Sequence, residues 1–63
     1  MKEVGYKGWV IITYKHIHYP PFLDFHSSAY KLVNNKKIGF TVEGETLEIA
    51  INNAKSKIDN WKD

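Results

Sequence analysis

The segment Thr46–Trp61, TLEIAINNAKSKIDNW, is the strongest structural signal in the chain, because its apolar residues repeat at the period of an α-helix. One face of that helix would carry Leu47, Ala50, Ile51, Ala54, Ile58 and Trp61. Thr46 stands where an N-cap is expected, since its hydroxyl can accept a hydrogen bond from an amide of the first turn. Glutamates gather before and in the first turn and lysines toward the end, as the helix dipole favours. We therefore expect an amphipathic helix whose apolar face the rest of the chain must cover.

Upstream of this helix, segments rich in β-branched and aromatic residues predict three strands. They are expected at Tyr6–Tyr14, continuing to His18, then at Ala29–Val33 and Ile38–Glu43. Pro20 and Pro21 end the first, because proline cannot donate to a strand ladder. Residues 22–28 fit either a loop or the start of the second strand, residues 34–37 form a hairpin turn, and residues 1–5 form a frayed lead. The predicted fold is α+β, a three-stranded antiparallel sheet packed on one C-terminal helix (β-β-β-α), in a single domain spanning residues 1–63.

Side-chain alternation assigns two faces to this predicted sheet. The face expected against the helix carries Val10, Ile12, Tyr14, Tyr30, Leu32, Ile38, Phe40 and Val42. The outer face is expected to carry Lys7, Trp9, Ile11, Thr13, Lys15, Lys31, Val33, Lys37, Gly39, Thr41 and Glu43. The first strand is apolar on both sides, so both of its faces need cover, and the predicted helix covers one.

Composition limits the classes of function. The 63 residues contain no cysteine, which excludes disulfides and thiolate metal sites, and their 43% hydrophobic content exceeds that of disordered chains. The formal charge of +2 is far below the excess typical of nucleic-acid binders. We recognise no signal segment, no membrane-spanning run, no catalytic triad order and no glycine-rich phosphate loop. We therefore expect a cytoplasmic protein that is not an enzyme and carries no cofactor.

Apolar residues on the predicted outer face favour a protein-binding function. Trp9, Ile11 and Val33 would form an exposed patch there, and such patches usually mark contact with a partner or with a second copy of the chain. Ile49, on the outer side of the helix among asparagine and serine residues, is a further candidate contact. The sequence thus predicts a small binding module that engages a protein partner or forms a homodimer, with no membrane role.

Lysines on the same predicted face raise a nucleic-acid alternative. Ammonium groups can meet phosphates while an aromatic ring packs on a sugar or base. The candidate contacts are Lys7, Trp9, Thr13, Lys15, Lys31 and Lys37. A solvated sheet face that carries lysines for solubility has the same pattern.

The histidines raise a third alternative, a metal site. His16 and His18 are two residues apart in a strand and would point the same way, and Asp24 and His26 could complete a ligand set. Imidazole and carboxylate are both zinc ligands. Exposed strand and loop histidines without a metal fit the same residues.

Several families share parts of this pattern. Residues 44–51, followed by Asn53-Ala54-Lys55, resemble the strand-to-helix entry of HicB-type antitoxins. The β-β-β-α order is similar to plant ethylene-response-factor domains and phage integrase arm-binding domains, which implies that the outer-face lysines contact DNA. Tyr6-Lys7-Gly8-Trp9, together with the C-terminal Thr-Leu-Glu pattern, resembles short uncharacterised proteins of phages and prophages. That resemblance implies a small effector that binds a host or phage protein, including inhibitors of bacterial defence.

Overall fold

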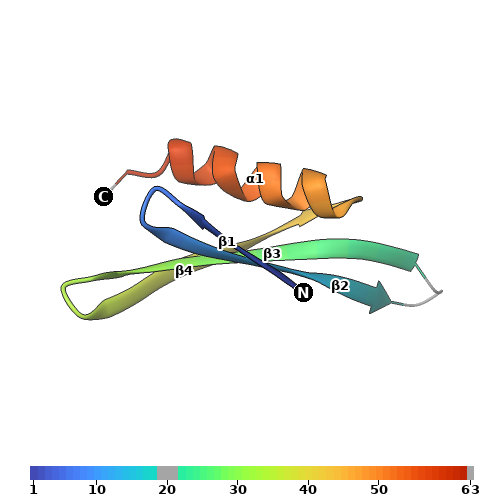
Figure 1. The fold of residues 1–63 in the computed structure, drawn as a ribbon, viewed down its shortest axis with the longest axis horizontal. Coiled ribbons are helices and arrows are strands. Elements are labelled where there is room, and N and C mark those ends of the chain that lie inside the picture. The colour runs from blue at the N-terminus through green and yellow to red at the C-terminus, as the bar shows by residue number, and fades with distance from the viewer. Residues whose placement is uncertain (19–21, 63) are drawn as a thin grey trace.

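The computed structural model describes residues 1–18 and 22–62, with side chains for 1–17 and 24–62, and within them the chain forms four strands and one helix (Figure 1). The elements are β1 (Lys2–Tyr6), β2 (Trp9–His18), β3 (Phe22–Val33), β4 (Lys36–Gly44) and α1 (Leu47–Asp59). The strands form an antiparallel sheet in the order β1-β2-β3-β4. The helix lies against one face and contacts β2, β3 and β4.

The α+β class, the antiparallel sheet and the C-terminal helix are confirmed, whereas the prediction of three strands is wrong. Residues 2–6, expected to be a frayed lead, pair with β2 as an edge strand. Lys7 and Gly8 have φ values of 50° and 83°, so a tight turn reverses the chain there and β2 begins at Trp9. Residues 22–28 belong to β3. Pro20 and Pro21, predicted to end the first strand, lie outside the described residues.

The turn between β3 and β4 is also tighter than expected. It consists of Asn34 and Asn35, whose φ values of 51° and 66° are those of a two-residue hairpin turn. Asparagine tolerates this left-handed region better than most residues. The shorter turn changes which residues face one another along the whole hairpin, and the candidate site depends on that register.

The predicted faces are wrong for β2 and β3 and confirmed for β4. Trp9 and Ile11, expected outside, lie under α1 with 3% and 0% of their surface exposed, and Thr13 is fully buried beside them. Leu32, expected inside, is 72% exposed. The inward residues of β4, which are Ile38, Phe40 and Val42, pack on the core as predicted.

Small residues explain how closely α1 approaches the middle of β3. Ser27 and Ala29 of β3 are buried beneath α1, which contributes the fully buried Ala50 and Ala54. Small side chains on both sides let the helix backbone approach the sheet closely, while the bulk of the core comes from neighbouring strands. The hydroxyls of Thr13 and Ser27 satisfy each other at 2.7 Å inside this core.

Aromatic rings close the core where α1 ends. The ring centroid of Trp9 lies 5.5 Å from that of Phe40 and 5.2 Å from that of Trp61, which follows the helix. These tilted and edge-on arrangements are favourable beyond the area that they bury. Trp61 therefore packs on the core, as the helical periodicity predicts.

The helix begins as the sequence predicts. Thr46 caps it by accepting a hydrogen bond from the amide of Ile49 at 3.1 Å. Asn53 donates its side-chain amide to the backbone carbonyl of Glu43, and Asn60 donates to the carbonyl of Ser56, so these asparagines fix the helix to β4 and end it. In the part of the chain that the structure describes, the helix is neither long nor apolar enough to span a membrane.

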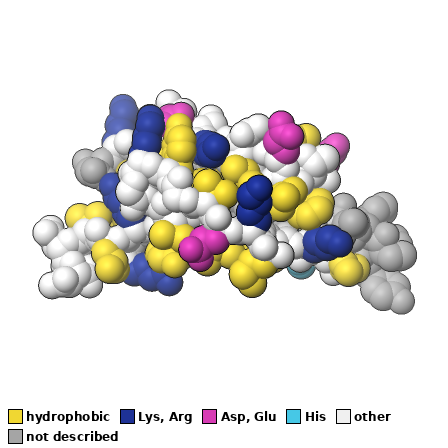
Figure 2. All heavy atoms as spheres, in the orientation of Figure 1, with side chains coloured by type: hydrophobic (Ala, Val, Ile, Leu, Met, Phe, Trp, Pro, Cys, Tyr) yellow, Lys and Arg dark blue, Asp and Glu magenta, His cyan; other side chains and the backbone are white. Residues whose placement is uncertain are grey.

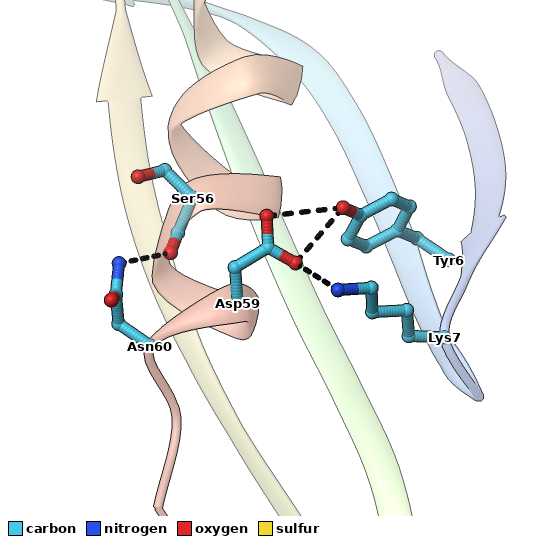
Figure 3. Close-up of polar contacts among 5 residues, drawn as sticks. All are labelled: Tyr6, Lys7, Ser56, Asp59 and Asn60. Atoms are coloured by element: carbon cyan, nitrogen blue, oxygen red, sulfur yellow. Dashed lines mark hydrogen bonds and ion pairs between the residues drawn. The ribbon is translucent and has the colours of Figure 1, made fainter.

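The far end of α1 is tied to the β1–β2 turn by polar contacts (Figure 3). The Tyr6 hydroxyl donates to both carboxylate oxygens of Asp59, at 2.9 and 3.1 Å, and Lys7 Nζ donates to Oδ1 at 2.6 Å. The hydrogen bond from Lys7, followed by that from Tyr6, holds the pKa of Asp59 below its ordinary value of 3.8. The same contacts raise the pKa values of Tyr6 and Lys7. The turn and the helix end therefore stabilise each other.

The sheet is longer than its helical cover. The molecule measures 41 Å along its longest axis, and a helix of 13 residues spans about 20 Å. The β3–β4 hairpin extends beyond α1 at one end of Figure 1, and the paired ends of β2 and β3 extend beyond it at the other.

We predict that Gly44→Ala destabilises the domain by about 1–3 kcal/mol, the usual cost of overpacking. A Cβ atom at residue 44 would lie 2.7 Å from the Cα of Ala50 and 2.9 Å from the carbonyl carbon of Ile49, both of them helix backbone. Urea denaturation followed by circular dichroism measures the effect. Gly5→Ala is the matched control, because a Cβ there meets nothing within 4 Å. Equal stability of the two variants would contradict close packing at Gly44.

We also predict that Asp59→Asn lowers the melting temperature near pH 7 and that this difference disappears in acid. A carboxylate whose pKa is depressed on folding stabilises the native state above its unfolded pKa of 3.8, and the contribution is lost as the pH falls through the folded pKa. Because the pKa of Tyr6 is raised above 10.0, its share is lost as the pH rises through that raised value. Melting curves from pH 3 to 11 test both limits. Glu45→Gln is the control, and an Asp59→Asn deficit that is constant with pH would refute the interaction.

Candidate functional site

The sheet face opposite α1 is the candidate functional site, because no element of the described chain covers it. We call it the open face. Its described side chains come from alternate residues of the four strands, which place Glu3, Val10, Ile12, Tyr14, His16, Asp24, His26, Ser28, Tyr30, Leu32, Lys37, Thr41 and Glu43 there, with Gly5 and Gly39 between them.

Strand register arranges the open face in rows. Val10 pairs with Tyr30, and Ile12 with Ser28, so the middle of the face is apolar and hydroxyl-bearing. Ser28 bonds across to Thr41 at 3.0 Å. Val10, Ile12 and Tyr30 are half-buried by their neighbours alone. Figure 2, a side view with α1 above the sheet, shows separate hydrophobic groups at the molecular surface among charged and other groups.

One end of the open face is basic and apolar. Leu32 pairs with Lys37 there. The ammonium of Lys37 lies 4.4 Å from the ring centroid of Tyr30, a cation–π contact that holds this lysine over the face. The end nearest the β3–β4 turn therefore carries a positive charge beside an exposed leucine.

The other end carries histidines and carboxylates. His16 pairs with Asp24, and His26 with Glu43. The rings of His16 and His26 stack with their centroids 4.4 Å apart, and Tyr14 meets His26 edge-on at 5.8 Å. We call His16, Asp24, His26 and Glu43 the His–carboxylate cluster; they line a surface hollow of about 340 Å³.

The residues predicted for partner binding do not share a surface. Trp9 and Ile11 are core residues, so the expectation that they are exposed is wrong, and the reason is that α1 covers their side of β2. Val33 is 36% exposed and lines a hollow with Ile38 and Trp61 beside the helix end. Ile49 is 43% exposed on the outer side of α1.

The residues predicted for nucleic-acid contact are also scattered. Thr13 is buried with Trp9, while the ammonium of Lys31 lies 5.1 Å from the Trp9 ring centroid, on the helix side of the sheet. Lys7, in the β1–β2 turn, forms an ion pair with Asp59 at the end of α1. Lys15 lies on the helix side of β2. Lys37 lies on the open face, whose described carboxylates, Glu3, Asp24 and Glu43, would repel phosphates. The geometric basis of the nucleic-acid prediction is therefore wrong, although binding itself stays a prediction.

Two of the predicted metal ligands, Asp24 and His26, do lie together, with His16 stacked beside them. The side chain of His18 lies outside the described residues. Glu43, which sequence reasoning missed, completes the group. The signal for it was available: pairing outward from a two-residue Asn34–Asn35 turn places Glu43 opposite His26, whereas the expected longer turn does not.

Comparison of the chain with protein-family models, curated proteins and solved structures finds no match. The resemblances to HicB-type antitoxins, to sheet-based DNA-binding domains and to short phage proteins therefore stay predictions.

We predict opposite outcomes for truncating Trp9 and Leu32. Trp9→Ala removes the centre of the aromatic cluster and should cost about 3–5 kcal/mol, which is comparable to the whole stability expected of so small a core. In the monomer, Leu32→Ala, on the open face, should change stability by less than about 0.5 kcal/mol. Urea denaturation compares the two with wild type. A stable Trp9→Ala variant would contradict the observed assignment of faces.

Proposed function

We propose that the chain is a small non-catalytic binding module whose protein-binding surface is the open face and whose occupant there is a second copy of the chain. The observation that carries this proposal is the charge pattern along β4. Lys37 and Glu43 point to the same side of that strand, with Gly39 and Thr41 between them.

The middle of the open face has the composition of an interface core. Two tyrosines, Tyr14 and Tyr30, flank the aliphatic residues Val10 and Ile12, and Leu32 projects beside them. Aromatic and aliphatic residues at the centre with charges at the rim are typical of protein-binding surfaces. Two such faces can stack at the spacing of packed sheets, about 10 Å.

The charge pattern is complementary to itself. A two-fold axis that lies in the interface plane and crosses the strands exchanges the two ends of β4 between copies. Lys37 of each copy then faces Glu43 of the other, and the apolar rows meet in the middle. Such an isologous contact forms each ion pair twice. The same rotation brings Leu32 over the opposite copy's His26, where an aromatic surface is available.

The size of the chain adds a reason for association. A domain of about 60 residues buries only about 60% of the surface that its unfolded chain exposes, less than a larger domain does, and its net stability is limited accordingly. Stacking the open faces would remove from water the apolar side chains that α1 leaves uncovered. The resemblance to short phage proteins supplies a setting, in which the dimer binds a host or phage protein.

Charge exchange at Lys37 and Glu43 tests the proposal. Sedimentation equilibrium in EDTA should show that wild type forms dimers. Lys37→Glu and Glu43→Lys should each weaken dimerisation by about tenfold or more, since a repulsive pair replaces an attractive one at both ends. The double variant K37E/E43K should recover affinity to within about threefold, because the exchanged pair forms the same contact.

Lys36→Glu is the matched control, because Lys36 is an exposed neighbour of Lys37 on the opposite side of β4. It should leave dimerisation unchanged. A wild-type protein that stays monomeric at millimolar concentration would overturn the homodimer. An unrecovered double variant would overturn the proposed two-fold arrangement.

A further inference from the structure

The His–carboxylate cluster collects side chains from three strand segments that are distant in the sequence. Asp24 and His26 alternate on β3, so they point to the same face, and Glu43 reaches the same point from β4. His16 comes from β2, opposite Asp24. These residues belong to the open face, yet the charge pairing proposed for the dimer uses Glu43 alone among them.

Three potential ligand atoms converge in this cluster. The Nε2 atom of His26 lies 3.8 Å from Oδ1 of Asp24 and 3.8 Å from Oε1 of Glu43. Each of the three residues offers one ligand atom, a ring nitrogen from His26 and a carboxylate oxygen from Asp24 and from Glu43. These three atoms lie within 4.8 Å of one another. Ligands about 2.1 Å from a tetrahedral ion are separated by about 3.4 Å, so small side-chain rotations bring this group to coordination distance.

The burial of the three side chains differs, so that two of the ligands are held in place and the third is free to move. The side chains of His26 and Asp24 are 19% and 24% exposed, and Oδ1 of Asp24 is shielded from solvent. The Glu43 side chain is 71% exposed and can swing toward an ion. The stacked ring of His16 and the edge of Tyr14 restrict how the His26 imidazole can turn. Restricting a ligand in this way lowers the entropy lost on binding.

We infer that Asp24, His26 and Glu43 form a binding site for a divalent transition metal of the zinc class. The mixed nitrogen and oxygen donors select this class, because magnesium and calcium prefer oxygen alone and no thiolate is present. Two carboxylates supply the negative charge that a divalent cation requires. With three protein ligands, a fourth position remains for water or for a donor group of a molecule that docks on the open face.

Zinc titration of untagged, EDTA-treated and dialysed protein tests the inference. Isothermal titration calorimetry, at a protein concentration at which the chain sediments as a monomer, should show one zinc ion bound per chain. The melting temperature should rise with zinc concentration, because the ion binds the native state. Magnesium chloride at the same concentration should leave the melting temperature unchanged.

Substitutions distinguish the residues that coordinate zinc from neighbouring residues that do not. His26→Gln and Glu43→Gln should each weaken zinc binding by more than about 100-fold, above the range seen on loss of a second-shell partner. His16→Gln should weaken it less, by about 100-fold at most, since His16 acts through the orientation of His26. Glu45→Gln, a neighbouring exposed carboxylate outside the cluster, should have no effect.

Circular dichroism and the melting temperature in EDTA confirm that each variant is folded before its affinity is compared. The absence of a heat of binding and of a thermal shift up to millimolar zinc would overturn the site. So would equal zinc affinity in His26→Gln and wild type, or an equal response to magnesium. Because this titration uses the monomer and the charge-exchange experiment uses EDTA, either proposal can fail without the other.

Discussion

The close packing of α1 on one face of the sheet is the interaction on which the other features depend. Gly44, Ala50, Ala54 and Ala29 keep the two backbones near each other, and the rings of Trp9, Phe40 and Trp61 seal one end. Because the helix covers one side of a longer sheet, the opposite side meets solvent with its apolar residues uncovered. The open face is thus a direct consequence of how the core is built.

A sheet with one uncovered face either binds a partner through that face or leaves its apolar residues exposed to solvent. In this chain the face is graded, with a lysine and a leucine at one end, aliphatic and tyrosine side chains in the middle, and imidazoles with carboxylates at the other end. Because the two ends of the face differ in charge and chemistry, a molecule that docks there binds in one orientation. It also separates two chemistries, since apolar contact in the middle does not require the cluster at the end, and metal coordination does not require the middle.

The two proposals meet at Glu43. As an exposed side chain, it can face a lysine of a second copy or coordinate an ion with His26 and Asp24. A carboxylate has two oxygens, so both contacts are geometrically compatible, but each withdraws negative charge from the other. Zinc and dimerisation would then be thermodynamically linked through one side chain, and the linkage would be reciprocal.

The sequence alone predicts the helix, its cap at Thr46, the α+β class and the inward residues of β4, because these depend on local periodicity and on single side chains. It also placed Asp24 and His26 in a common group. The sequence could not determine which side of β2 is buried, since Trp9-Val10-Ile11-Ile12 is apolar on both sides and alternation offers two equal solutions. Tertiary structure decided between them, because α1 approaches closely only where β3 presents Ser27 and Ala29. It likewise added Glu43 to the cluster, since the two-residue Asn34–Asn35 turn, with positive φ at both residues, fixes a register that propensities leave open.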